Sequence, residues 1–227
     1  MDSKLIARYA IRETLGLVGM GVALFWSAGR LDWWPAWAAL AVMAGWTMAM
    51  AVVIVRFSPN LLRERLGPRK GAKPWDTAIM SLLGLAQLAR YIVAGLDQRY
   101  GWTGEVPLVA QIAALIIGVL GYALFVWATA SNAFFSQIVR IQIERGHTVA
   151  TGGPYRYVRH PAYIGAIVYE LAAPVLLASG WAGIPSGLCA MPLILRTALE
   201  DRTLQAELAG YAHYARQVRY RLLPGIW

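Results

Sequence analysis

The chain has 227 residues, of which 58% are hydrophobic and 15% are charged, and its formal net charge is +9. Apolar stretches of about twenty residues recur along it, the length that a helix needs to cross a bilayer, and this excludes an ordinary soluble domain. The basic residues cluster between these stretches, as in membrane proteins, and no nucleic-acid-reading motif accompanies them. We therefore expect a lipid bilayer, and not nucleic acid, as the partner of the basic loops.

The first two membrane spans are expected at residues 11–28 and 36–55, joined by a turn that carries Trp33 and Trp34. Tryptophan residues in such turns are typical of the membrane interface. Basic residues precede the first span and no signal-peptide cleavage pattern follows it. We therefore expect an uncleaved first span with its N-terminal end on the cytoplasmic side.

A strongly basic loop follows at residues 56–76, and the third span is expected at residues 77–96. The charge places this loop in the cytoplasm. The next loop is short and near neutral, so it should face outward, and the fourth span, residues 106–130, returns the chain to the cytoplasm. These spans are expected to contain almost no polar residues apart from Gln87 and Gln111.

The last apolar block, residues 162–195, has glycines and a proline near its middle, which predicts a helical hairpin that dips across and returns. The return helix is expected to end at Arg196, and a polar C-terminal helix is expected over residues 197–217. The predicted fold is therefore all-α, a polytopic transmembrane bundle of about five to six spans, since each span needs about twenty residues.

The segment between these spans, residues 131–161, is too polar for lipid and too long for a simple turn. A Gly152-Gly153-Pro154 turn is followed by a dense set of hydrogen-bonding and aromatic side chains: Tyr155, Arg156, Tyr157, Arg159, His160 and Tyr163. Pro161 suits the first turn of a helix, and a helix N-terminus favours an anionic group such as a carboxylate. The alternative is that these side chains are plain interfacial anchors.

The run GPYRYVRHPAY, residues 153–163, resembles the signature of the membrane methyltransferases related to isoprenylcysteine carboxyl methyltransferase and to phospholipid N-methyltransferases. A second block resembles the family's Arg-x-x-x-Glu-Glu-x-x-Leu and reads Arg196-x-x-x-Glu200-Asp201-x-x-Leu204. Asp201 stands where the family often has a second Glu. The chain ending, Tyr211-x-x-Tyr214-x-x-x-Val218 through Arg221-x-x-Pro224, is also similar, so the resemblance covers about residues 125–227.

The resemblance implies S-adenosylmethionine as the cofactor, bound between the polar loop and the C-terminal helix. The implied cofactor contacts are Arg140, His147, Thr148, Val149, Ala150, Tyr155, His160, Pro161, Ala162, Tyr163 and Glu200. Arg196 stands where the family places a substrate-facing arginine, and with Glu200 it forms the implied catalytic pair. The resemblance divides the chain into a membrane anchor with substrate access, residues 1–130, and a methyltransferase region, residues 131–227.

Arg196 and Glu200 are four residues apart and so share one helical face. Their plain structural interpretation is a simple ion pair. Beside a cationic cofactor, Glu200 instead attracts the ammonium or sulfonium, or holds a ribose hydroxyl, and Arg196 holds an anionic substrate group with two parallel hydrogen bonds.

A metal site is not expected, because His147, His160 and His213 lack metal-ligand spacing and no cysteine cluster supports them. Neither a Walker nor a Rossmann glycine pattern is present, so the cofactor site is of another kind.

The expected reaction is methyl transfer to a lipophilic or lipid-linked substrate at the cytoplasmic face. A carboxylate or thiolate acceptor is favoured, because its charge and that of the sulfonium cancel in a low-dielectric site. A phospholipid or other amine is the alternative, but it needs a base, for which the sequence offers only Glu200 or His160. A non-enzymatic transporter or assembly factor is the alternative from another class, and it would need polar groups within the spans.

Overall fold

The computed structural model describes residues 3–57, 59–66 and 71–227, and these contain helices and no strand. The helices are α1 (Ser3–Ala28), α2 (Trp34–Phe57), α3 (Pro59–Leu66), α4 (Pro74–Tyr100), α5 (Leu108–Ala130), α6 (Pro161–Leu176), α7 (Gly183–Glu207) and α8 (Tyr211–Gln217), with short 3-10 turns η1 (Ile143–Arg145) and η2 (Gly153–Arg156). The predicted all-α class is confirmed. Of the basic loop, Arg69 and Lys70 lie outside the described residues.

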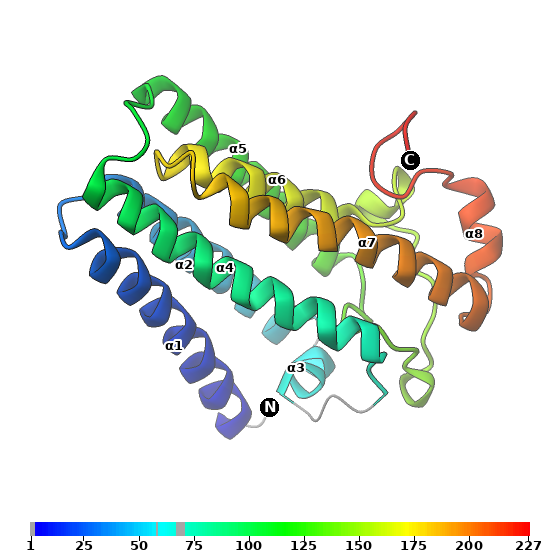
Figure 1. Ribbon diagram of the computed structural model, residues 1–227. Helices are drawn as coiled ribbons and strands as arrows, with labels where there is room; N and C mark the ends of the chain where they lie inside the picture. Colours follow the sequence, from blue (N-terminus) through cyan, green and yellow to red (C-terminus); the bar gives the residue numbers. More distant parts are fainter. Residues whose placement is uncertain (1–2, 58, 67–70) are drawn as a thin grey trace.

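Six long helices pack in a closed circuit. In order around it they are α1, α2, α5, α6, α7 and α4, and α4 packs again on α1. The polar segment between α5 and α6 and the C-terminal residues after α7 gather at one end of this bundle (Figure 1). Side chains from all six helices line a common cavity inside this circuit.

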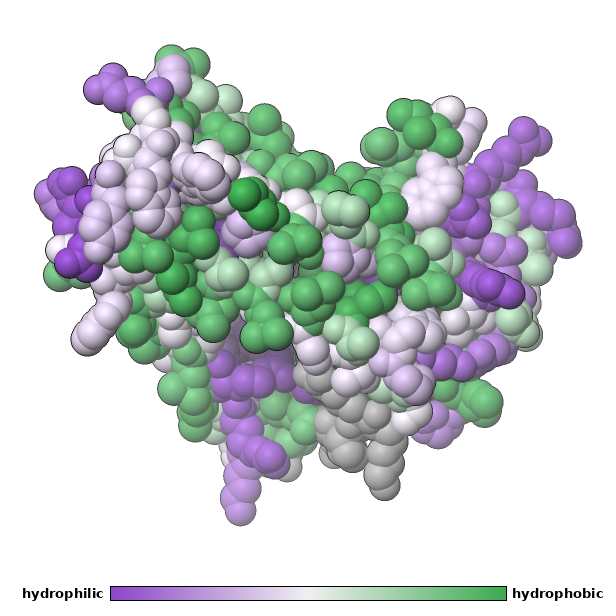
Figure 2. Space-filling view, viewed as in Figure 1, coloured by the Kyte–Doolittle hydropathy of each residue, from purple (hydrophilic) through white to green (hydrophobic). Residues whose placement is uncertain are grey.

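The bundle has the surface of an integral membrane protein. Three helices, α2, α4 and α5, are long and apolar enough to cross a bilayer. Large hydrophobic side chains are exposed along the outer faces of the long helices, and in Figure 2 they cover the surface between hydrophilic margins. Helix α6 is also apolar but has only 16 residues, about 24 Å of helix, so it is shorter than the hydrocarbon core.

The hairpin of α6 and α7 is present, but the prediction that its return helix ends at Arg196 is wrong. Helix α7 continues without a break to Glu207, and the separate C-terminal helix begins only at Tyr211. Residues 197–207 contain no glycine or proline, so nothing in them stops a helix. The break comes at Gly210, whose φ of 84° is a conformation that favours glycine.

Glycine lets α5 and α6 approach closely. A Cβ on Gly165 would lie 2.2 Å from the carbonyl oxygen of Gly121, and one on Gly121 would lie 2.7 Å from that of Gly165. Small residues at such a crossing allow backbone contact between membrane helices. The contact fixes the start of α6, and hence the polar segment before it, against α5.

The expectation that the spans are almost free of polar groups beyond Gln87 and Gln111 is wrong for α4. Arg90 on α4 is completely buried and forms an ion pair with Glu170 on α6, while Gln87 donates a hydrogen bond to the same carboxylate at 2.9 Å. Arg90 was overlooked because a single charge does not interrupt an apolar stretch of this length. A buried charge in a membrane helix needs such a partner.

Candidate active site

One cavity of about 560 Å³ occupies the axis of the bundle at its polar end. Most residues that the family resemblance implied as cofactor or substrate contacts line it: Arg140, His147, Thr148, Val149, Ala150, Tyr155, His160, Ala162, Tyr163, Arg196 and Glu200. Pro161 is the exception, since it is buried as the first residue of α6 and does not line the cavity. The size is that of a site for a small molecule.

The polar segment closes over the cavity through tight turns and side-chain contacts. Gly153 has a φ of 56°, and a Cβ there would lie 2.2 Å from the Ser131 hydroxyl, so only glycine fits this turn. Tyr155 is buried behind the turn, where its carbonyl accepts a hydrogen bond from Tyr214 at 2.7 Å. The segment therefore rests against α8, although it has little regular structure of its own.

His147 lies flat on an aromatic ring at the edge of the cavity. Its imidazole stacks on Phe134 with 4.7 Å between ring centroids, and its Nδ1 accepts a hydrogen bond from the backbone N–H of Gln142 at 3.3 Å. Partial burial, together with the nearby charges of Arg145 and Arg140, lowers the pKa of His147. The ring is therefore neutral at pH 7 and offers a flat, partly apolar surface.

Asp201 is the most densely bonded side chain of the site. It is fully buried, and Arg159 donates to both of its oxygens at 2.7 and 3.0 Å. Arg221 donates at 2.8 Å and Tyr211 at 3.0 Å, and Nε2 of His160 lies 3.3 Å away. Although burial opposes it, these hydrogen bonds and charges hold the pKa of Asp201 far below its usual range.

The Asp201 cluster joins four separate segments, namely α7, the end of the polar segment, α8 and the C-terminal residues. Backbone hydrogen bonds also connect the polar segment to the C-terminal residues. The N–H groups of Arg159 and His160 donate to the carbonyls of Tyr220 and Arg221 at 2.9 and 3.0 Å. His160 is thus held at the cavity wall by the C-terminal residues. From the sequence, Asp201 was noted only as a departure from the family's second Glu.

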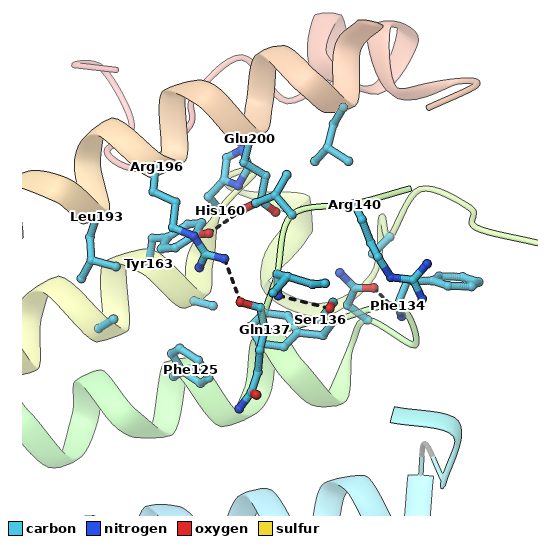
Figure 3. Close-up of a pocket in the computed structure, with 18 of the residues that line it drawn as sticks. Phe125, Phe134, Ser136, Gln137, Arg140, His160, Tyr163, Leu193, Arg196 and Glu200 are labelled. Atoms are coloured by element: carbon cyan, nitrogen blue, oxygen red, sulfur yellow. Dashed lines mark hydrogen bonds between the residues drawn. The ribbon is translucent and has the colours of Figure 1, made fainter. Parts of the chain in front are cut away.

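Arg196 and Glu200 do not form the ion pair that their spacing allows. Arg196 donates through Nε to Asp76 at 2.6 Å and through Nη2 to the carbonyl of Gln137 at 2.9 Å. Glu200 accepts a hydrogen bond from the Tyr163 hydroxyl at 2.5 Å (Figure 3). The guanidinium of Arg196 lies 5.4 Å from the Tyr163 ring centroid, so the three side chains remain adjacent at the wall of the cavity.

Asp76, which sequence reasoning missed, fixes this part of the wall. It is fully buried in the first turn of α4, and its second oxygen accepts a hydrogen bond from the N–H of Val139 at 2.8 Å. It therefore holds both Arg196 and the part of the polar segment around Val139. Its place two residues after Pro74 marked a helix start, but it was counted only as a charge of the basic loop.

Arg140 lies at the rim, where it forms an ion pair with Glu144 at 2.7 Å. Figure 3 shows it on the polar segment, across the cavity from α7. Side chains of the N-terminal helices also line the cavity, among them Trp46 of α2, Met80 and Leu83 of α4 and Phe125 of α5. The segment expected to be a membrane anchor therefore contributes directly to the site.

Comparisons with known proteins match much of the chain that forms this site. Residues 113–206 match the model of the isoprenylcysteine carboxyl methyltransferase (ICMT) family. A probable protein-S-isoprenylcysteine O-methyltransferase of rice, Oryza sativa subsp. indica, is 27% identical over 139 residues, which cover 58% of this chain and 70% of that protein. Protein-S-isoprenylcysteine O-methyltransferase A of Arabidopsis thaliana is 29% identical over 102 residues, which cover 44% of this chain and 48% of that protein.

The matched region begins within α5 and runs nearly to the end of α7, so it contains the polar segment, the start of α6 and the Arg196–Asp201 stretch. These parts supply most of the polar wall of the cavity. With the helical membrane bundle around them, the matches identify the chain as an isoprenylcysteine carboxyl methyltransferase-like membrane methyltransferase.

Proposed function

We propose that this protein transfers the methyl group of S-adenosylmethionine to a carboxylate on a lipophilic, S-prenylcysteine-type acceptor at the cytoplasmic face of the membrane. The observation that carries the proposal is one continuous cavity, which joins a polar chamber under residues 131–160 to an apolar space between the helices. A polar cofactor and a lipophilic acceptor can meet at the junction of two such chambers. Arg196, Tyr163 and Glu200 stand at that junction (Figure 3).

The residues of the polar chamber fit S-adenosylmethionine. Glu200 provides a carboxylate for a cationic group, and the neutral His147 ring and Tyr155 provide flat surfaces for an adenine. The backbone of residues 147–150 supplies hydrogen-bonding groups along the same wall. When bound, S-adenosylmethionine supplies a methyl group on a sulfonium, and transfer of that group to a carboxylate cancels two opposite charges without moving a proton.

Arg196 is placed to hold the acceptor carboxylate. Asp76 and the Gln137 carbonyl fix its Nε and Nη2, and within the described part of the chain its Nη1 has no hydrogen-bond partner. A guanidinium fixed in this way presents its remaining N–H groups in a defined direction, which suits a planar carboxylate. Since a carboxylate needs no deprotonation, the proposed site needs no general base, and its residues bind, orient and exclude water.

The proposed cytoplasmic face follows from charge. Basic side chains such as Arg56, Lys73 and Arg140 gather at the polar end, whereas the opposite loops are short and nearly neutral. We expect a cysteine at His213, an exposed residue of α8, to be shielded from an impermeant thiol reagent in intact cells, and a cysteine at Gly104 to be labelled. Cys189 is buried and should not react. Labelling at position 213 and not at 104 would reverse this topology.

The methyl acceptor is tested with purified protein, S-adenosylmethionine labelled in its methyl group, and an N-acetyl-S-prenylcysteine in mixed micelles. We expect labelled product from which mild base releases methanol, because methyl esters hydrolyse under conditions that leave N-methyl and thioether groups intact. Because this acceptor has neither a free amine nor a free thiol, the absence of a base-labile labelled product would overturn the carboxylate assignment. The N-acetylcysteine amide of the same prenyl group, which lacks the carboxylate, is the matched control.

A further inference from the structure

The end of the cavity farthest from the polar segment is not apolar. Of the residues that line the cavity, Gln87 is the farthest along α4 from its cytoplasmic start, and Glu170 is the farthest along α6. Seven residues of helix, about 10 Å, separate Glu170 from Tyr163 at the junction. The carboxylate of Glu170 and the carboxamide of Gln87 therefore form the far end of the cavity. A hydrocarbon chain that extends from the junction toward them would contact only apolar walls.

The charge of Glu170 is already neutralised. Arg90, buried behind it, forms an ion pair with Glu170, and its Nη2 donates to the Tyr91 hydroxyl at 3.1 Å. The guanidinium also lies 4.9 Å from the Tyr91 ring centroid. This pair connects α4 to α6 without help from Gln87. A cationic ligand group is therefore not required at this end of the cavity.

Gln87 is half-buried and turns its amide N–H to Glu170 at 2.9 Å. Within the described part of the chain, its carbonyl oxygen has no hydrogen-bond partner. An acceptor left unpaired in an apolar chamber costs free energy. Because the available groups at this end, the Gln87 carbonyl and the Glu170 carboxylate, are acceptors and the ion pair is neutral, the fitting ligand group is an uncharged hydrogen-bond donor, a hydroxyl.

The wall between the two polar ends is apolar and open. Met80 and Leu83 of α4, Ala166 of α6 and Leu193 of α7 line it. Gly84 lines it as well, and no atom lies within 4 Å of the position that a Cβ would take there. An extended chain covers about 10 Å in roughly nine bonds, since three backbone bonds span at most about 3.6 Å.

We propose that the preferred acceptor carries a hydroxyl at the far end of its apolar chain, and that Gln87, with Glu170, is the specificity-determining group that receives it. The inference rests on the proposed carboxylate methylation and adds the second polar contact of the acceptor. It assigns to the membrane interior a recognition role that is separate from the chemistry at Arg196 and Glu200.

The test compares two acceptors, N-acetyl-S-geranylcysteine and the same compound with a hydroxyl on the terminal carbon of the geranyl chain. For the parent protein we expect the hydroxylated compound to have a KM lower by about two- to tenfold, the range of one hydrogen bond. Gln87→Leu should remove this difference between the two KM values. Gln111→Leu, which removes a buried glutamine of α5 that does not line the cavity, should keep the difference.

Equal KM values for the two acceptors in the parent protein would overturn the inference, as would a preference that survives in Gln87→Leu. A second pair of variants tests the chamber itself. Gly84→Leu should raise the KM of both acceptors because its side chain fills the open wall. Gly45→Leu, at a glycine of α2 that also has open space but does not line the cavity, should not.

Failure of the proposed carboxylate methylation can be distinguished from failure of the hydroxyl site. If neither acceptor is methylated, the unfolding temperature is measured with the two methyl esters, which need no reaction to bind. Greater stabilisation of the parent protein by the hydroxylated ester, lost in Gln87→Leu, supports the hydroxyl site even if the carboxylate assignment fails. Equal stabilisation by the two esters overturns it.

Discussion

The buried charged clusters around Asp201 and around Glu170 differ in what they connect. Asp201 accepts hydrogen bonds from Gln205 on its own helix and from the polar segment, α8 and the C-terminal residues. The last three have no long regular structure where they meet the carboxylate. Glu170 has two donors, Arg90 and Gln87, both from the single helix α4. A charge beside irregular chain can gather many hydrogen bonds, whereas a charge between packed helices meets only the side chains that face it.

Buried charges therefore have two different uses in this protein. The Asp201 cluster gives shape to segments that would otherwise have no fixed position, and the cofactor wall depends on that shape. The Arg90–Glu170 pair joins helices that apolar packing already holds together. Losing the first should therefore affect the site and the fold at once, and losing the second should mainly affect stability.

The largest effect is expected for Asp201→Asn. The change leaves Arg159 and Arg221 without their anion, and an arginine cannot shed its charge, so the loss should reach the upper part of the about 3–5 kcal/mol range for a broken buried pair. Thermal unfolding in detergent, together with calorimetric titration of S-adenosylmethionine, measures both consequences. Asp32→Asn, which removes an exposed ion pair with Arg30, is the control and should change neither. Normal cofactor affinity in Asp201→Asn would show that the cluster does not shape the site.

A smaller loss, about 3 kcal/mol, is expected for Arg90→Met, because the Glu170 carboxyl left behind can take up a proton and an arginine could not. The double variant Arg90→Met/Glu170→Met should recover most of this stability, since replacing a buried pair with apolar residues of similar size is often nearly neutral. The unfolding temperatures of the single and the double variant, measured in the same detergent, test this recovery. A double variant that is less stable than the single one would give the pair a stabilising role beyond mutual neutralisation.

The next largest expected effect is a difference in cofactor affinity between variants of Glu200 and Arg196. Glu200→Gln should weaken S-adenosylmethionine binding by about ten- to a hundredfold, the range for a lost hydrogen bond to a charged group of roughly 1.5–3 kcal/mol. Arg196→Lys should leave cofactor affinity near normal and lower turnover, because lysine keeps the charge but loses the directed N–H groups. Titration of the cofactor and a methyl-transfer assay measure these effects separately. Equal losses of cofactor affinity in both variants would contradict the division of roles.

The smallest effect concerns His147. Burial and nearby arginines lower its pKa in the folded protein, whereas in the unfolded chain it is about 6.5. The unfolded state therefore binds more protons, so the stability contributed by the neutral ring is complete above about pH 6.5 and is lost as the pH falls through the lower folded pKa. His147→Gln should flatten this part of the stability curve between about pH 7 and pH 5. An unchanged curve would mean that another group titrates there.

The sequence alone determined the class of the fold and the position of most of the candidate site. Apolar stretches of span length predicted the helices, because helix formation and membrane burial depend on local composition. The residues of the 146–165 segment were named together through the family resemblance, whose motif is a continuous stretch of the chain. Their partners in the structure, such as Asp201, Glu200 and Tyr214, lie far along the chain, and that motif does not identify them as partners.

Tertiary structure decided the contacts between distant segments. Asp76 and Arg196 are separated by 120 positions, and Arg90 and Glu170 by 80. No local pattern selects one carboxylate over another as the partner of a given arginine. For Arg196 the i,i+4 neighbour Glu200 was available, yet the arginine turned to Asp76 because the packing of α4 against α7 placed that carboxylate within its reach. Burial leaves each charge with the few partners that folding brings beside it, and sequence spacing contains no information about which partners those are.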